Sequence, residues 1–414
     1  MDVNRKDSLL ALMKKKLLRN ISPDSMTGRT VLVRVDYNVP LDNLCRVTDL
    51  SRIERTIPTL EYLISAGAKL VLISHLGRPG GRREPELSLY PIVGHLQRLL
   101  DKKVEFCSEV VGPKAREAVS GLSNGDVLLL ENTRFHPEET ENDILWSDEI
   151  RHEADIFVND AFGMAHRSHA STTGVSKTTK KCGGISVAGF LMETEIKVLS
   201  KVLSEPARPL VGVIGGAKIS GKIDLIEELL RRVDSLLIGG AMSNTFFLAM
   251  GHNVGESLVE EKFVDFAQDL LREFKDKLFL PIDVMTAKSI GTGISPEHRK
   301  IGEIGESDKV VDIGNQTIQV FSEIIVRSKT LIWNGPMGIF EIPSFATGTF
   351  RLAEAAAEAA KQGSYVILGG GDSSAAAKAA GVFTRMTHVS TGGGATLEFL
   401  SGKTLPGYEA LSDE

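Results

Sequence analysis

The feature that most constrains the fold is a repeated alternation of short apolar runs with segments of helical periodicity. Runs such as Lys69–His75 and Pro209–Ile214 are almost continuously aliphatic, and a turn and then a helix-like pattern follow them. Strands that are apolar on both faces belong to parallel sheets that are covered by helices on each side. The alternation runs through the chain as two series, which predicts an α/β protein with two doubly wound parallel sheets.

The predicted elements have definite positions in the sequence. Strands are expected at Thr30–Tyr37, Lys69–His75, Asp126–Glu131, Asp155–Asn159, Pro209–Ile214, Ser235–Ile238, Leu278–Val284, Thr330–Trp333 and Ser364–Leu368. Helices are expected at Ile53–Ala66, Lys222–Arg232, Phe263–Lys275 and Phe350–Gln362.

The two series suggest two domains joined by a helix. The chain has 414 residues, which is enough for two or more domains of ordinary size. Residues 189–204 have helical periodicity, lie between the two series and end at Glu205-Pro206. We therefore expect domains at 1–188 and 205–403, with 189–204 as a connecting helix; an ordinary surface helix is the alternative for that segment.

Charge and cysteine content narrow the functional classes. The chain has 48 Lys and Arg against 54 Asp and Glu, a net charge of −6, which argues against a protein that coats nucleic acid. Cys45, Cys107 and Cys182 form no C-x-x-C pair, which is typical of reduced thiols in the cytoplasm. No apolar run has the length of a membrane helix, and Leu9–Met13 is too short for the apolar region of a signal peptide. We expect a cytoplasmic protein without membrane or nucleic-acid partners. The first twenty residues are expected to form a surface helix, with a small amphipathic targeting helix as the alternative.

Polar residues that packing does not require follow the strands of the first half. They include four arginines and three histidines: Arg52, Arg78, Arg134, Arg167, His75, His166 and His169. Ligands of parallel sheets gather at the carboxyl ends of strands, and a guanidinium group pairs with two phosphate or carboxylate oxygens at once. These residues predict a site for a small, multiply charged anion, with solvated surface charge as the alternative. Zinc is not expected, because the histidines have no Cys or paired carboxylates beside them.

Two glycine-rich loops of the second half lead from a strand into a helix. Gly216 to Lys222 nearly matches the P-loop pattern, but Ile223 replaces the hydroxyl residue that would bind Mg²⁺. Gly369–Ser374 repeats the arrangement, with Asp372 able to bind Mg²⁺ and Ser373 able to cap a helix. Backbone N–H groups at a helix start bind phosphate, so we expect a nucleotide in this half.

Further glycines could complete a flat pocket for the base. Gly239-Gly240 and Trp333–Pro336 each follow a predicted strand. Any single glycine pair is also compatible with a simple turn, and the absence of G-x-G-x-x-G disfavours a dinucleotide. Because one half suits a small anion and the other a nucleotide, the pattern favours phosphoryl transfer across a cleft. No Ser-His-Asp or Cys-His set supports covalent acyl transfer.

The motifs, taken together and in order, resemble the phosphoglycerate kinase family. They are RVDYNVP from Arg34, SHLGRP from Ser74, ENTRFHPEE from Glu131, NDAFGMAHRSHAST from Asn159, GGAKISGKI from Gly215, WNGPMGIFE from Trp333, GGGDSS from Gly369 and VSTGGGATLEFLSGKTLPG from Val389. The resemblance covers nearly the whole chain. It implies two Rossmann-like domains facing across a cleft, and reversible transfer of phosphate between 1,3-bisphosphoglycerate and ADP to give 3-phosphoglycerate and Mg·ATP. We also expect a monomer.

The resemblance implies roles for residues of the first half. Asp36 and Asn38 would bind the hydroxyl and carboxyl end of the glycerate, and Arg52 would stabilise the transferring phosphoryl group. The far phosphate would be held by His75, Arg78, Arg134 and Arg167.

In the second half the resemblance implies a nucleotide site with a metal ion. Lys218 and Lys222 would contact the phosphates and the transferred group, and together with Arg52 they form the expected catalytic set. The other nucleotide-binding residues would be Gly215, Gly216, Gly239, Pro336 at the adenine, Glu341 at the ribose, and Gly371, Asp372, Ser373 and Ser374 at the phosphate end. Asp372 would bind Mg²⁺.

Some implications concern the domains. Residues 404–414 are expected to pack back on the first domain, and 189–204 and Ser390–Gly394 are the hinge candidates.

Three residues depart from the family pattern. Thr133 and Met164 are unusual for the family but flank the functional groups. Val310 stands where the family commonly has glycine near the nucleotide; a branched side chain there could narrow the base pocket, so Val310 is not assigned to the site.

The residues suit the phosphoryl transfer that the resemblance implies. The acceptor is a carboxylate, which is ionised at neutral pH and needs no general base, so catalysis depends on positioning and positive charge. A non-catalytic binding protein on the same fold is one alternative; it would be expected to lack Arg52, Lys218 or Asp372, which are all present. A nicotinamide dehydrogenase is another alternative, which titration with NAD would test.

Overall fold

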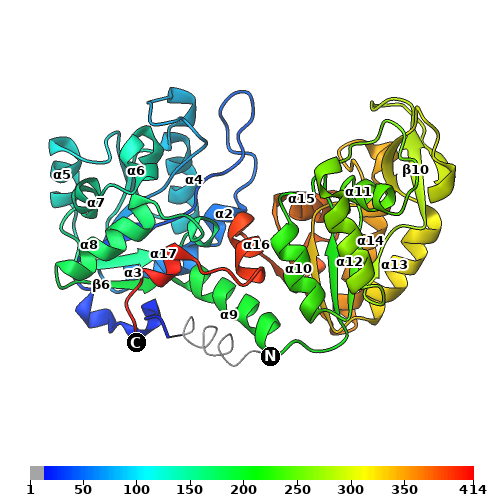
Figure 1. Ribbon diagram of the computed structural model, residues 1–414. Coiled ribbons are helices and arrows are strands. Elements are labelled where there is room, and N and C mark those ends of the chain that lie inside the picture. The colour runs from blue at the N-terminus through cyan, green and yellow to red at the C-terminus, as the bar shows by residue number, and fades with distance from the viewer. Residues whose placement is uncertain (1–13) are drawn as a thin grey trace. The chain divides into compact units, whose positions relative to one another are not determined.

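The structure is a computed structural model that describes residues 14–414, and these form two compact units (Figure 1). The first unit contains the chain up to Ser200 together with Thr404–Glu414, and the second contains Lys201–Lys403. Each unit is built on a six-stranded parallel sheet, which confirms the predicted α/β class with two doubly wound sheets. Most of the surface helix predicted for the first twenty residues lies outside the described residues; within 14–20 only Leu18–Asn20 is helical, as a short 3-10 helix.

The sheet of the first unit has the strand order β3-β4-β2-β1-β5-β6. Its strands are β1 (Thr30–Arg34), β2 (Lys69–Ile73), β3 (Val104–Cys107), β4 (Val127–Leu130), β5 (Ile156–Asn159) and β6 (Ile185–Ala188). Its helices are α2 (Ser51–Glu54), α3 (Ile57–Ser65), α4 (Tyr90–Leu100), α5 (Pro113–Ser120), α6 (Pro137–Glu141), α7 (Ile144–Arg151), α8 (Val175–Lys181), α17 (Pro406–Glu409) and most of α9 (Phe190–Ser204). Every residue of β4 and β5 is buried, because helices cover both faces of the sheet.

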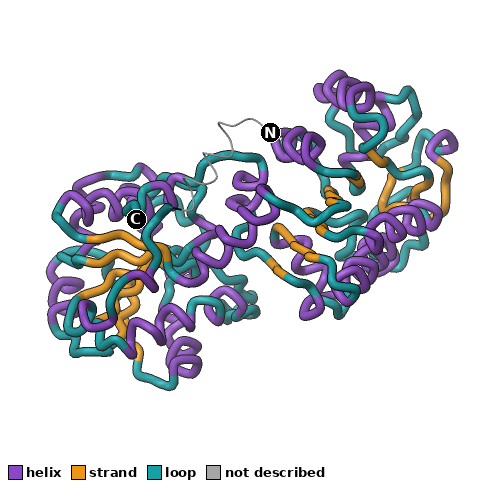
Figure 2. Tube along the Cα trace, turned by 90° about the horizontal axis from the view of Figure 1, so that it is seen from below, coloured by secondary structure: helices purple, strands orange, loops and turns teal. Residues whose placement is uncertain are grey.

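The sheet of the second unit has the order β15-β14-β13-β7-β8-β9, and its strands lie among helices (Figure 2). Its strands are β7 (Leu210–Ile214), β8 (Ser235–Ile238), β9 (Leu278–Phe279), β13 (Thr330–Asn334), β14 (Tyr365–Gly369) and β15 (His388–Val389). A separate antiparallel sheet contains β10 (Asp283–Ala287), β11 (Glu297–Lys300) and β12 (Lys309–Ile313). The helices are α10 (Ile223–Arg232), α11 (Met242–Ala249), α12 (Val264–Glu273), α13 (Asn315–Arg327), α14 (Thr347–Lys361), α15 (Gly371–Ala379) and α16 (Gly394–Leu400).

Two predicted elements are wrong because each contains a proline that interrupts it. The helix predicted over Ile53–Ala66 is two helices, α2 and α3, and Pro58 lies in the first turn of α3. A proline there lacks the N–H that a continuous helix would need. The strand predicted over Leu278–Val284 is interrupted at Pro281, so that β9 pairs with β8 while β10 begins the antiparallel sheet, which the sequence did not predict. The other predicted elements are confirmed with small differences at their ends.

The segment predicted as a connecting helix begins at Phe190, one residue later than expected. The Asp160 carboxylate accepts hydrogen bonds from the N–H groups of Leu191 (2.9 Å) and Met192 (3.1 Å). These N–H groups have no partner within the helix, because they belong to the first turn of α9. A Cβ on Gly189 would lie 2.3 Å from this carboxylate, so only glycine fits before the helix. Helix α9 continues past Ser200, the last residue of the first unit before the chain enters the second.

The C-terminal segment belongs to the first unit. The N–H of Gly407 donates to the carbonyl of Ala165 (2.8 Å), and the Ser176 hydroxyl donates to the carbonyl of Ala410 (2.7 Å). Helix α17 therefore lies against the loop that follows β5. Within residues 14–414, no helix combines the length and the apolar character needed to cross a membrane.

Candidate functional site

The candidate anion-binding residues of the first unit follow strands that are neighbours in the sheet. Strand β2 lies between β1 and β4, and all three are parallel, so their carboxyl ends open at one edge. Asp36 and Asn38 follow β1, His75 and Arg78 follow β2, and Arg134 lies in a short 3-10 helix after β4. The topology thus brings together residues that are far apart in the sequence.

Direct contacts connect these loops. Arg52, on α2, forms an ion pair with Asp36. The side-chain oxygen of Asn38 accepts a hydrogen bond from the N–H of Gly77 (2.9 Å), and Arg134 donates to the carbonyl of Gly77 (2.8 Å). The predicted residues Asp36, Asn38, Arg52 and Arg134 therefore belong to one cluster.

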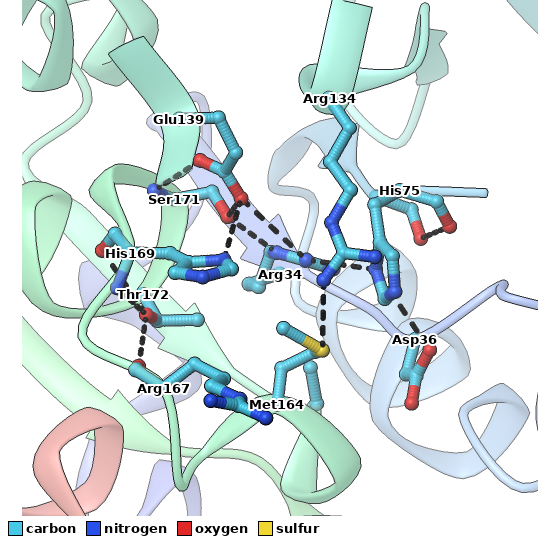
Figure 3. Close-up of polar contacts among 12 residues, drawn as sticks. Arg34, Asp36, His75, Arg134, Glu139, Met164, Arg167, His169, Ser171 and Thr172 are labelled. Atoms are coloured by element: carbon cyan, nitrogen blue, oxygen red, sulfur yellow. Dashed lines mark hydrogen bonds and ion pairs between the residues drawn. The ribbon is translucent and has the colours of Figure 1, made fainter. Parts of the chain in front are cut away.

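The remaining arginines lie at the rim of this cluster. Arg78 and Arg167 are exposed, and Arg167 donates to the ring of His166 (3.1 Å). Arg134 is half-buried and approaches the sulfur of Met164 at 3.9 Å (Figure 3). Burial, with the neighbouring charges of Arg34 and Arg78, lowers the pKa of Arg134 to about 10, so its guanidinium remains charged at neutral pH.

Two charged residues beneath the cluster were missed by the sequence-based assignment. Arg34 and Glu139 are fully buried, and their charged groups are 3.9 Å apart. The Glu139 carboxylate accepts bonds from the N–H (2.8 Å) and the hydroxyl (2.6 Å) of Ser171. An arginine inside an apolar strand requires a buried partner, and this was the available signal in the sequence.

His75 is also buried, at 1% exposure. Arg34 Nη2 lies 3.1 Å from His75 Nδ1, and an Asp36 oxygen lies 4.0 Å from the same nitrogen. Burial and the positive charges of Arg34 and Arg134 hold the pKa of His75 well below its usual range. The imidazole is therefore neutral at physiological pH.

The glycine-rich loops of the second unit meet where β7 and β13 lie side by side, the point at which the strand order reverses. The N–H of Gly215 donates to the carbonyl of Asn334 (2.9 Å), and the N–H of Gly216 donates to that of Pro336 (2.9 Å). The N–H of Gly240 donates to the carbonyl of Met337 (3.1 Å). These loops form one interlocked backbone layer, and the buried Gly239 belongs to it.

The two lysines of this half have different environments. Lys218 is exposed, whereas Lys222 stands immediately before α10 and donates to the carbonyls of Gly215 (2.7 Å) and Asn334 (3.2 Å). Burial lowers the pKa of Lys222 to about 8, and the negative charge of Asp372 opposes this shift. Helix α10 begins at Ile223, one residue later than predicted, with Lys222 as the residue before its first turn.

The second loop leads directly into α15. Gly370 has φ 94°, and Gly371 and Asp372 are exposed in the first turn of the helix. The prediction that Ser373 caps the helix is wrong. Ser373 is the third residue of α15, and its hydroxyl accepts a bond from the N–H of Gly335 (2.7 Å), which ties α15 to the β13 loop. The Ser374 hydroxyl donates to the carbonyl of Gly370 (3.0 Å).

The residues assigned to the base and ribose lie farther along the β13 connection. Pro336 is buried within the interlocked layer, and Glu341 is exposed between β13 and α14. Among the described residues, no side-chain hydrogen bond connects Glu341 to these loops. Val310, on β12, is half-buried against a cluster that includes Phe247 and Val284.

Gly240 should tolerate no side chain. It has φ 69°, and a Cβ there would lie 2.4 Å from the nitrogen of Gly216. We expect Gly240→Ala to abolish measurable ADP binding in calorimetry, because the layer must open to admit the methyl group. Gly221→Ala is the matched control, since a Cβ at Gly221 meets open space; equal ADP binding by both variants would contradict this expectation.

Comparison with known proteins identifies the family of the chain. The family model described as phosphoglycerate kinase matches residues 21–403. The phosphoglycerate kinases of Chlorobium phaeobacteroides and Chloroflexus aurantiacus are each 48% identical to the chain, over 404 and 406 residues, covering 97% of the chain and 100% of each relative. The solved phosphoglycerate kinase of Coxiella burnetii has a TM-score of 0.83 at 37% identity, covering 96% of this chain and 98% of that one. That of Pyrococcus horikoshii has a TM-score of 0.82 at 31% identity, with the same coverage.

Proposed function

Since the chain belongs to the phosphoglycerate kinase family, it is a phosphotransferase with a carboxyl group as acceptor, and we propose that its two units divide the reactants between them. The reaction is reversible transfer between 1,3-bisphosphoglycerate and ADP, giving 3-phosphoglycerate and ATP. The first unit binds the acid and the second binds the nucleotide. We place the reaction in the cytoplasm, in agreement with three free cysteines, and expect a monomer.

The observation that carries the proposal is the convergence of positive charge at one edge of the first sheet. Arg34, Arg52 and Arg134 all act on the electrostatic environment of His75, and they come from three different elements. Guanidinium groups in this arrangement suit a phosphate and a carboxylate on one small molecule. In our proposal Asp36 and Asn38 orient the glycerate, and His75, Arg78, Arg134 and Arg167 hold its phosphate.

In this proposal the nucleotide binds at the interlocked layer of the second unit. Lys218 and Lys222 contact phosphate oxygens in this proposal, together with the N–H groups at the start of α15. Gly215 and Gly216 belong to the loop that approaches the phosphates. Gly239 and Pro336 provide a flat surface for the base, and Glu341 binds the ribose. Because the acceptor is already a carboxylate, the residues need only align the reactants and neutralise charge.

The residues fit a magnesium ion that arrives with the nucleotide. Among residues 14–414, no cluster of three or more His, Cys, Asp or Glu side chains could hold a metal by itself. Mg²⁺ is usually bound by one or two carboxylates together with substrate phosphates, and Asp372 offers one exposed carboxylate at a helix start. The ion would neutralise charge on the phosphates, while Asp372 would hold it there.

A coupled assay tests the function directly. We expect ADP to form from ATP only when 3-phosphoglycerate and Mg²⁺ are both present. Direct transfer also predicts that no covalent phospho-protein accumulates in rapid-quench experiments with radiolabelled ATP. ADP formation that does not depend on 3-phosphoglycerate, or a kinetically competent phospho-protein, would contradict the proposal.

Transfer also requires the acid and the nucleotide to meet with water excluded. We propose that the chain closes by bending within 189–204 and Ser390–Gly394. The radius of gyration measured by small-angle scattering should then fall when 3-phosphoglycerate and nucleotide are both saturating, and not with either alone. An unchanged radius with both ligands would argue against closure.

A further inference from the structure

A buried chain of polar contacts runs beneath the anion site from α6 to the end of β2 (Figure 3). It begins at the carboxylate of Glu139, which is 2.6 Å from the hydroxyl oxygen of Ser171. That oxygen is 2.7 Å from Arg34 Nε, and Arg34 Nη2 is 3.1 Å from His75 Nδ1. Glu139, Ser171 and Arg34 are each 0% exposed, so water does not compete for these contacts.

The chemistry of the four groups fixes the direction of every bond in this chain. A carboxylate only accepts, so the Ser171 hydroxyl donates its proton to Glu139. The oxygen of Ser171 is then free to accept from Arg34 Nε. A guanidinium group has donors and no acceptor, so Arg34 Nη2 donates to His75 and Nδ1 must carry a lone pair.

We propose that Glu139, Ser171 and Arg34 are positioning residues that hold His75 as the neutral tautomer protonated at Nε2. His75 thereby presents an N–H donor, and no positive charge, to the anion. Within residues 14–414, Nε2 has no hydrogen-bond partner, so its proton is available to a ligand. That Nε2 donates to the anion rests on the proposed function, whereas the assignment of the tautomer rests on the buried contacts alone.

The charges around His75 support the same protonation state. Arg34 on β1, Arg52 on α2 and Arg134 after β4 disfavour an imidazolium. Glu139 on α6 and Asp36 after β1 are the acidic groups that oppose them. Protonation of Nδ1 would place a donor against the donor of Arg34. The contribution of His75 to anion binding should therefore not change over the pH range in which an exposed histidine titrates.

The tautomer can be measured on the unmodified protein without substrate. Protein labelled with ¹⁵N in histidine gives long-range ¹H–¹⁵N correlations that distinguish the two ring nitrogens. We expect His75, assigned through His75→Gln, to show a protonated Nε2 and an unprotonated Nδ1 from about pH 5.5 to about pH 8. An Nδ1-protonated ring or an imidazolium at neutral pH would overturn the proposal.

Ser171→Ala tests the relay. It removes the hydroxyl that orients Arg34, and we expect the Nδ1-protonated form to become detectable. Ser168→Ala is the matched control, because Ser168 is exposed and should leave the His75 signals unchanged. Signals of His75 that are identical in the wild type and Ser171→Ala would overturn the role of Ser171.

The donor at Nε2 is tested by calorimetric titration with 3-phosphoglycerate. The amide nitrogen of His75→Gln can replace Nε2, whereas that of His75→Asn can only reach the Nδ1 position. We expect His75→Asn to weaken binding on the order of tenfold or more, and His75→Gln to restore most of it. Equal binding by both variants would overturn the inference; a wild type that does not bind 3-phosphoglycerate would instead overturn the proposed function, and the tautomer measurement would still decide the inference.

Discussion

Replacing Arg52 with alanine is expected to lower kcat on the order of 10² or more, because arginines that stabilise a transferring phosphoryl group contribute about 10³–10⁵ in rate. The KM for 3-phosphoglycerate should change far less. Steady-state kinetics in both directions, with each substrate varied at saturating partner, measures both quantities. An interaction that strengthens only in the transition state appears in kcat, whereas one that is equal in the ground state appears in KM.

The position of Arg52 explains why it should differ from the other arginines. It lies on α2 and is paired with Asp36, and 32% of its side chain is exposed. Arg134, in contrast, is anchored to the carbonyl of Gly77 in the loop after β2. In the proposed arrangement Arg134 holds a phosphate that does not react, while Arg52 meets charge that develops during transfer.

Two further variants make the Arg52 experiment decisive. Arg52→Lys keeps the charge beside Asp36 but cannot bridge two oxygens, so it should recover only part of kcat. Arg78→Ala removes an exposed guanidinium group and should mainly raise KM. If Arg52→Ala keeps a nearly normal kcat and only raises KM, Arg52 is one more anion ligand and the assignment is wrong.

The sequence predicted the fold well because burial leaves a strong pattern in parallel sheets. Strands such as β4 and β7 are apolar throughout, so their positions follow from composition and spacing alone. Prediction failed where one residue overrides the pattern, as Pro58 and Pro281 do. Strand β3 was missed because it has only four residues and Glu105 interrupts its apolar run.

The candidate site was predicted in part, for a physical reason. Residues after strand ends share one edge of a parallel sheet, so Asp36, His75 and Arg134 could be grouped without coordinates. The partners beneath them could not. Glu139 lies in a helix that reads as an ordinary acidic segment, and only the fold places it against Arg34. Likewise, serine is a residue type that commonly caps helices, and only the structure shows that the Ser373 hydroxyl accepts a hydrogen bond from the N–H of Gly335 instead.

Glu139→Gln should cause the largest loss of stability among single changes near the site. Burial by itself would raise the pKa of Glu139, but contacts with His169, Arg34 and Ser171 lower it to about 2. Compared with the reference value of 4.5, this shift corresponds to about 3 kcal/mol of folding free energy at neutral pH. Removing one partner of a buried ion pair costs a similar amount, about 3–5 kcal/mol, because Arg34 remains buried without its counter-charge.

The sign of the pH dependence separates this mechanism from a packing defect. The folded state favours the ionised carboxylate, so the stabilisation is complete above the unfolded pKa of 4.5 and is lost as the pH falls through about 2. The difference between wild type and Glu139→Gln should therefore shrink by about 1 kcal/mol between about pH 6 and about pH 3.5. A packing defect would give a difference that does not depend on pH.

The two tryptophans of the chain allow this loss to be assigned to one unit. Trp146 lies on α7 in the first unit and Trp333 on β13 in the second, so urea unfolding in a Trp333→Phe background reports on the first unit through Trp146. Glu141→Gln, an exposed change on the same helix α6, is the matched control and should alter stability by less than about 0.5 kcal/mol. If Glu139→Gln behaves like this control, the ion pair with Arg34 does not stabilise the first unit. Arg34 would then have to be held by Ser171 and the backbone alone, and the carboxylate beneath the anion site would have no measurable energetic role.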